Sequence, residues 1–220
     1  TQVYPSFPGG GLVTSLGMES PRDRPDMEKV WLKSYPPGIP TEIEVESCET
    51  LVTMLEQACE RFGPRPAFTS FGHSITYDEL DRLTRRFAAW LQSLPGVGPG
   101  DRVAIMLPNV IQYPVALFGT WRAGMVVVNV NPLYTAPELS HQLADSGAKV
   151  LVVVDHRAAT FEEIESETGV RHVLVTGVGD MLGFPKGPFL NFAIKYIRRL
   201  GRSWHLPEAW SWRRAMDRSP

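Results

Sequence analysis

The sequence predicts an α/β protein in which helices flank a layered, parallel sheet. Short apolar runs alternate with helical patterns, turn residues separate them, and the links between them are short. The runs at 103–107, 125–130, 150–154 and 172–176 have the continuous apolar character of strands that are buried on both faces. Three helices separate these four strands, so we expect right-handed crossovers between parallel neighbours.

The helices and the hairpin that precede this sheet are marked by periodicity and capping residues. Residues 51–62 carry apolar side chains on one helical face, and 67–71 with 74–77 form a hairpin around Gly72 and His73. Thr76 and Glu79 have the spacing of a capping box, in which each side chain binds the other residue's backbone N–H. We therefore expect a second helix directly after Thr76.

Similar signals mark the helices between the strands. Thr135 and Glu138 form a second capping box, with proline in the first turn. Asn109 is predicted to cap the helix that ends before Gly124. Residues 158–167 read as a polar helix. In contrast, the three prolines within 31–40 are expected to exclude a helix there.

The composition shifts divide the chain into three parts. Residues 1–26 are rich in Gly, Pro and Ser without periodicity, as in a tag remnant or a disordered extension with no enzymatic role. Residues 27–180 hold the α/β pattern. Residues 181–220 combine a basic amphipathic helix with a tryptophan-rich tail.

Composition excludes several functional classes. A formal charge of −2 does not give the basic surface that nucleic-acid binding requires. Two cysteines, Cys48 and Cys59, make neither a disulfide framework nor a metal site, and we expect the buried Cys59 thiol to act as a small hydrophobe. No apolar stretch reaches the length of a membrane span. Together these features predict a protein of the reducing cytoplasm.

Motifs that would identify a reaction are absent from the sequence. It contains no G-x-x-x-x-G-K-[ST], no G-x-G-x-x-G between a strand and a helix, no H-E-x-x-H and no G-x-S-x-G. The glycine-rich segment 96–100 precedes a strand and reads as a turn. Composition and spacing therefore predict a fold class without a reaction.

Polar residues after the second strand of the sheet are the candidates for substrate contact. Asn131, Tyr134 and Thr135 lie in a loop at the carboxyl end of that strand, where ligands of α/β sheets bind. The alternative is that Asn131 and Thr135 are turn and cap residues and that Tyr134 packs beside them. Both interpretations stay open at this point.

The last part of the chain offers a candidate membrane surface. Between Lys186 and Arg202 the chain carries five basic and no acidic residues, interleaved with apolar ones. Such a helix can rest on an anionic bilayer through basic and aromatic side chains; the candidates are Lys195, Arg198, Arg199 and Trp204. The alternatives are packing against further parts of the protein or against a second subunit.

A resemblance to a known family covers most of the chain, from about Met27 to Arg214. The run from Asp101 that contains LPNVIQYPVALFG and NVNPLYT resembles the adenylate-forming enzymes, which include acyl-CoA synthetases, luciferases and adenylation domains. The opening MEKVWLKSYPPGIPTEIE, the late NFAIKYIRRL and HLP at 205–207 are similar to bacterial long-chain fatty acyl-CoA synthetases in particular.

The resemblance implies a two-step reaction. A fatty acid attacks ATP to give an acyl-adenylate and pyrophosphate, and CoA then displaces AMP; ATP, CoA and Mg²⁺ are implied for the complete enzyme. The family's phosphate loop and lysines should follow Pro220, so the resemblance implies an N-terminal, truncated subdomain with no catalytic residue and no metal ligand of its own, inactive alone.

The implied partners are the remainder of the ligase or a second copy in a homodimer. An aryl or medium-chain acid as the substrate, or a stand-alone lipid- or protein-interaction module derived from such a ligase, are the alternatives.

Overall fold

The computed structural model describes residues 29–41, 50–197 and 202–217, without the side chains of residues 195 and 197. The chain divides into two compact units, 1–48 and 49–220. In the first unit, residues Val30–Ser34 form a 3-10 helix, η2, which ends before the first proline. The prediction that 31–40 excludes a helix is therefore wrong for residues 31–34, because the prolines only stop the turn at its carboxyl end.

The second unit is built on a five-stranded sheet whose pairs are all parallel, in the order β4-β3-β5-β6-β7. The strands are β3 (Arg102–Met106), β4 (Val126–Asn129), β5 (Val150–Val154), β6 (His172–Thr176) and β7 (Trp210–Ser211). The parallel α/β sheet is confirmed. The sequence predicted four of these strands and missed β7, because two residues are too short to show a period.

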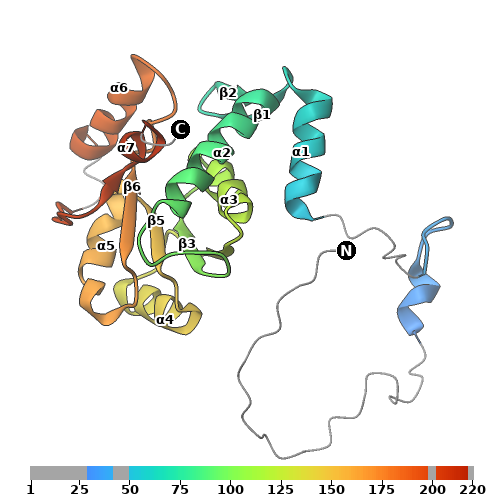
Figure 1. Cartoon of the computed structure of the whole chain (residues 1–220), viewed down its shortest axis with the longest axis horizontal. Helices are drawn as coiled ribbons and strands as arrows, with labels where there is room; N and C mark the ends of the chain where they lie inside the picture. The colour runs from blue at the N-terminus through green and yellow to red at the C-terminus, as the bar shows by residue number, and fades with distance from the viewer. Residues whose placement is uncertain (1–28, 42–49, 198–201, 218–220) are drawn as a thin grey trace, which may run out of the picture. The chain divides into compact units, whose positions relative to one another are not determined.

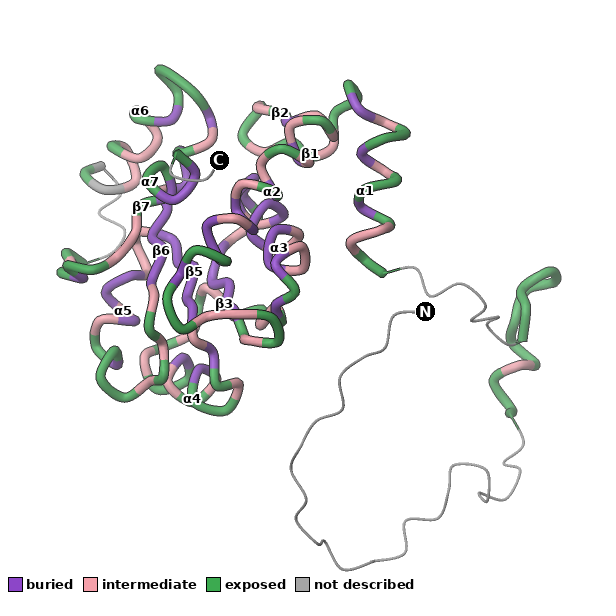
Figure 2. The backbone as a smooth tube through the Cα atoms, viewed as in Figure 1, coloured by how far each residue is buried: buried purple, intermediate pink, exposed green. Residues whose placement is uncertain are grey.

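Helices cover both faces of this sheet (Figure 1). α2 (Tyr77–Gln92), α3 (Gln112–Arg122) and α7 (Trp212–Asp217) pack with Val103, Ile105 and Val152 in one core cluster. α4 (Ala136–Ser146) and α5 (Ala158–Glu162) pack with Ala104 and Leu151 in a second cluster. Since successive residues of β3 and β5 enter opposite clusters, these central strands are buried on both sides, as Figure 2 shows. The two-sided burial predicted for 125–130 is wrong for β4, because it is an edge strand and Val126 is 47% exposed.

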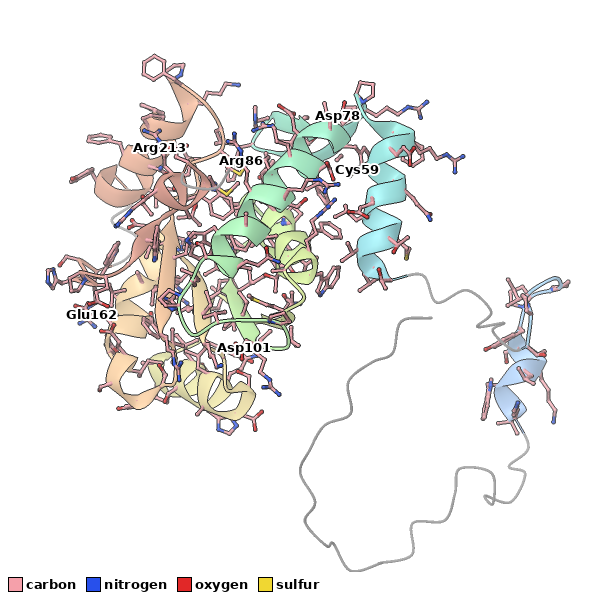
Figure 3. The ribbon with its side chains drawn as sticks, in the orientation of Figure 1. Cys59, Asp78, Arg86, Asp101, Glu162 and Arg213 are labelled. Atoms are coloured by element: carbon pink, nitrogen blue, oxygen red, sulfur yellow. The ribbon has the colours of Figure 1, made fainter. Side chains whose placement is uncertain are left out.

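A helix and a hairpin precede the sheet in the second unit. α1 (Leu51–Phe62) buries Leu55 and Cys59, and Figure 3 shows Cys59 on the side of α1 that turns toward α2. β1 (Pro66–Ser70) and β2 (His73–Thr76) pair antiparallel as predicted. The Thr76 capping box is also confirmed: the Thr76 N–H donates to Glu79 Oε2 at 2.8 Å, and the Glu79 N–H donates to Thr76 Oγ1 at 3.2 Å.

Other predicted boundaries were wrong. α3 starts at Gln112 with Ile111 as its N-cap, so Asn109 does not cap it; the Val110 N–H instead bonds the Pro108 carbonyl at 2.8 Å in a tighter turn. The predicted helix 158–167 breaks into α5 and one 3-10 turn, η4 (Glu165–Glu167), and a further 3-10 turn, η3 (Asp155–Arg157), precedes α5.

The predicted basic helix is described in part. It consists of α6 (Lys186–Phe192) and a π-helical turn, η5 (Ala193–Ile197). Its predicted continuation through 198–201 lies outside the described residues. Residues 202–217 belong to the same compact unit as the sheet and supply both β7 and α7.

Candidate functional site

The loop after β4, which holds the predicted substrate contacts, satisfies its polar groups locally. The Leu133 N–H donates to Asn131 Oδ1 at 3.0 Å, an Asx turn. The Thr135 N–H and hydroxyl both donate to Glu138 Oε2, at 2.8 and 2.7 Å, and these bonds hold the pKa of Glu138 below its ordinary value. Tyr134 is half-buried against the second core cluster. These contacts favour the turn-and-cap interpretation, and a ligand role for the three residues stays a prediction.

The topology places the expected binding crevice elsewhere. The chain moves from β3 to β4 on one side and from β4 to β5 on the other, so the switch point lies between β3 and β5. There the buried Gln112 side chain reaches from α3 to β6. Its Nε2 donates to Thr176 Oγ1 at 3.2 Å and to the Gly177 carbonyl at 2.8 Å. These two bonds tie the start of α3 to the carboxyl end of β6.

A polar network extends from this amide along the carboxyl edge of the sheet. Asp180 Oδ2 accepts from the Gly177 N–H at 2.8 Å and from Thr176 Oγ1 at 3.1 Å. Asn191 on α6 donates to Asp180 Oδ1 at 2.8 Å and accepts from the Gly179 N–H at 2.7 Å. A Cβ at Gly179 would lie 2.3 Å from the Gly187 carbonyl oxygen, so this close approach of α6 requires glycine. The network fixes α6 over the end of β6.

A cavity of about 420 Å³ opens beside this network, at the carboxyl ends of β5, β6 and β7. It is lined by two carboxylates, an imidazole and four aromatic rings: Asp155, Asp180, His156, Phe192, Tyr196, Trp204 and Trp210. Burial lowers the pKa of the His156 imidazole, and the neighbouring Arg157 acts in the same direction. The imidazole is therefore neutral at pH 7, and the lining carries negative charge.

This charge does not suit a triphosphate. Among the described lining residues there is no Lys or Arg to neutralise phosphate oxygens, and Asp155 and Asp180 would repel them. The described ranges also hold no group of three or more His, Cys, Asp or Glu side chains placed to bind a metal ion. The residues present do not fit ATP or Mg²⁺, and we derive no catalytic step from them.

Of the four predicted membrane contacts, the structure describes the side chain of Trp204 alone. The Lys195 side chain and residues Arg198 and Arg199 lie outside what the structure describes. Trp204 is half-buried, and its indole Nε1 donates to Asp155 Oδ1 at 3.0 Å. The exposed side chains are instead aromatic ones on and near α6: Phe184, Phe189, Phe192 and Tyr196. Within the described segments, no helix has the length and apolar character to cross a bilayer.

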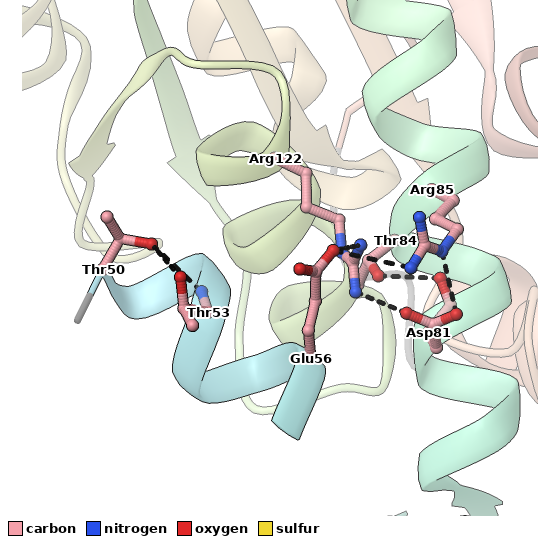
Figure 4. Close-up of polar contacts among 7 residues, drawn as sticks. All are labelled: Thr50, Thr53, Glu56, Asp81, Thr84, Arg85 and Arg122. Atoms are coloured by element: carbon pink, nitrogen blue, oxygen red, sulfur yellow. Dashed lines mark hydrogen bonds and ion pairs between the residues drawn. The ribbon is translucent and has the colours of Figure 1, made fainter. Parts of the chain in front are cut away.

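A second polar cluster ties three helices together, and the sequence did not reveal it (Figure 4). Arg122 on α3 is almost completely buried and pairs with Asp81 on α2 and Glu56 on α1; its Nη1 lies 2.8 Å from Glu56 Oε1. Arg85 adds a 2.9 Å bond to Asp81 from an exposed position. Next to them, burial raises the pKa of the Cys59 thiol, with a further rise from the Asp81 carboxylate. These groups hold the helices and are poorly suited to chemistry.

The parallel sheet with helices on both faces is the fold of the N-terminal part of adenylate-forming ligases. A long-chain-fatty-acid-CoA ligase from Archaeoglobus fulgidus superimposes with a TM-score of 0.53 and 30% identity, over 64% of this chain and 29% of that one. The family model of the AMP-binding enzymes matches residues 55–202. The chain belongs to this family.

Curated relatives extend the similarity along the sequence. The long-chain-fatty-acid–CoA ligase of Escherichia coli O157:H7 is 51% identical over 190 residues, which are 86% of this chain and 34% of that protein. A salicyl-AMP ligase/salicyl-S-ArCP synthetase of Mycobacterium tuberculosis is 38% identical over 158 residues, 67% of this chain and 26% of that protein. The chain thus spans about a third of the length of the first of these relatives.

Proposed function

We propose that this chain is the N-terminal α/β part of a long-chain fatty acid–CoA ligase. The overall reaction converts ATP, a fatty acid and CoA into acyl-CoA, AMP and pyrophosphate. The observation that carries the proposal is 51% identity to the Escherichia coli O157:H7 ligase along 86% of the chain. The 190 aligned residues are a longer stretch than residues 55–202, which the family model matches.

The contribution of this part is a scaffold. Adenylation requires donors and cations held around the phosphates in a fixed geometry, and the carboxyl-edge cavity offers two carboxylates in their place. We therefore place the binding of ATP and Mg²⁺, which are implied for the complete enzyme together with CoA, on groups outside this cavity. The sheet, its two helix layers and the Asp180–Asn191 network supply a rigid surface against which such groups can be held.

A ligase for an aryl or medium-chain acid is the alternative within the same reaction class. The 38% identity to the salicyl-AMP ligase supports it, because that protein is named for an aromatic acid. A stand-alone interaction module is the alternative from another class. One experiment distinguishes these two alternatives from the proposal. It asks whether this part restores catalysis when it is joined to a ligase, and with which acid.

The test is a chimera. Residues 27–220 replace the matching third of the Escherichia coli O157:H7 ligase, and acyl-CoA formation is measured with palmitate, octanoate and benzoate. We expect palmitoyl-CoA formation by the chimera and no ATP–pyrophosphate exchange by the 220-residue chain alone. A folded chimera without activity on any acid contradicts the ligase assignment, and exchange by the isolated chain contradicts the scaffold role.

We further propose that the protein acts in the cytoplasm and touches anionic membranes through exposed aromatics near α6. Phe184 is 91% and Phe189 68% exposed, and Lys186 lies between them. Aromatic rings next to basic residues bind the headgroup region of a bilayer. A homodimer formed through the same rings is the competing explanation for their exposure.

Flotation with phosphatidylglycerol vesicles at low salt tests the membrane contact. We expect the chain to float, the F184S/F189S variant to lose most of the binding, and high salt to weaken it. Leu133→Ser is the matched control, since Leu133 is 77% exposed but lies in the loop after β4. Absence of flotation by the unmodified chain contradicts the proposal. Light scattering on the same samples detects a dimer, which the double variant would disrupt.

A further inference from the structure

The carboxyl-edge cavity gathers aromatic rings from three separate segments of the chain. Phe192 and Tyr196 come from α6 and η5, with ring centroids 4.8 Å apart, and they are 55% and 59% exposed at the rim. Trp204 comes from the segment before β7 and Trp210 from β7 itself, and both are half-buried. Large rings from such distant positions meet at one site only because the tertiary structure folds the last segment back onto the sheet.

The charged groups of the cavity restrict what it can hold. Asp155 and Asp180 give the lining a negative charge, His156 is neutral, and the described lining residues include no Lys or Arg. Anions are therefore disfavoured. A cation is favoured, both by the carboxylates and by the ring faces, whose quadrupole attracts positive charge.

The two carboxylates are partly engaged within the protein. Asp180 accepts from Asn191, Thr176 and Gly177, and Asp155 Oδ1 accepts from the Trp204 indole. A quaternary ammonium requires no hydrogen-bond acceptor, and it gains both from the nearby carboxylates and from contact with the faces of the lining rings.

The Arg214 guanidinium lies over the Trp210 ring, with its Cζ 4.6 Å from the centroid, so this ring already contacts a cation from within the protein. The rings left for a ligand are those of Phe192, Tyr196 and Trp204. We propose that these three rings, together with Asp155 and Asp180, bind a quaternary ammonium group in the cavity. This site is independent of the ligase function proposed above.

Calorimetric titration of the 220-residue chain with tetramethylammonium and choline chlorides tests the proposal. We expect dissociation constants on the order of 1 mM, as a few cation–π contacts provide. The control ligand is 3,3-dimethyl-1-butanol, which has the shape of choline without its charge, and it should bind at least about tenfold more weakly. Equal binding of the neutral analogue, or no binding of either cation, overturns the proposal.

Two variants locate the site. Asp155→Asn keeps an acceptor for the Trp204 indole while removing the charge, and Trp204→Leu removes a ring; each should weaken choline binding about tenfold. Trp31→Leu is the matched control, because Trp31 is 51% exposed in the other unit of the chain. If Trp204→Leu fails to fold, Asp155→Asn still decides: unchanged choline affinity in that folded variant overturns the proposal.

A quaternary ammonium can come from a free metabolite or from a choline lipid. Phosphatidylcholine vesicles distinguish these sources: vesicle binding that free choline displaces indicates a lipid headgroup, and choline binding without vesicle binding indicates a small molecule. Both results support the site. Vesicle binding that choline does not displace and that Asp155→Asn leaves unchanged counts against it. The variant F184S/F189S, which tests the membrane contact, should leave choline affinity unaltered.

Discussion

Replacing Asp81 with alanine is expected to lower the free energy of unfolding by about 3 kcal/mol, because the change removes a partner from a buried cation. The Arg122 side chain is 5% exposed, and its two partners are Asp81 and Glu56. In the variant, Glu56 still pairs with the Arg122 guanidinium, but from a position that is 45% exposed. Because part of the Arg122 charge stays compensated, we place the loss at the lower end of the range for a broken buried pair. Figure 4 shows how the remaining carboxylate and arginines converge between α1, α2 and α3.

Urea unfolding followed by circular dichroism measures this loss. Arg82→Ala is the control on the same helix, since Arg82 is exposed, and it should change stability by less than about 0.5 kcal/mol. Arg122→Met should cost less than Asp81→Ala, because it leaves carboxylates that water can reach, and the double variant should cost less than the sum. A loss below about 0.5 kcal/mol for Asp81→Ala would show that the cluster is fully screened.

Replacing Phe87 with alanine is expected to cost about 4 kcal/mol, because it opens a cavity where three helices meet. The Phe87 side chain has no exposed surface. Its ring lies 5.3 Å from the Trp90 ring and 5.7 Å from the Trp212 ring, between centroids. It also packs directly on the backbone of α3 at Gly119. For a unit of this size, the loss corresponds to a decrease in Tm of about 10 °C.

Gly119→Ala tests the same contact from the opposite direction. A Cβ at Gly119 would lie 2.8 Å from Phe87 Cδ1 and 2.9 Å from Phe87 Cβ, so the added methyl group should cost about 1–3 kcal/mol through overpacking. In the double variant the contacts with Phe87 Cδ1 and Cγ are gone and only the approach to Cβ remains, so the combined loss should be smaller than the sum of the single losses. Strict additivity in thermal unfolding would contradict direct packing between these residues.

The local features of the fold were readable in the sequence because local forces determine them. The Thr76 and Thr135 segments begin helices where their side chains and the following glutamates pair with backbone donors. The central strands follow from continuous apolar runs, which only two-sided burial explains. Asn109 was misread because its cap signal competes with the tight Pro108–Val110 turn, whose hydrogen bond shifts the start of α3.

The amino-acid sequence by itself determined the α/β class, most helix starts and the resemblance to adenylate-forming ligases, since these depend on residues that are near one another in the chain. The tertiary structure decided the fifth strand, the burial of Arg122, the reach of Gln112 to β6 and the aromatic cavity. Gln112 and Thr176 are 64 residues apart, and their hydrogen bond depends on strand order. Strand order is set by how the whole chain buries both faces of its sheet, and no local pattern encodes it.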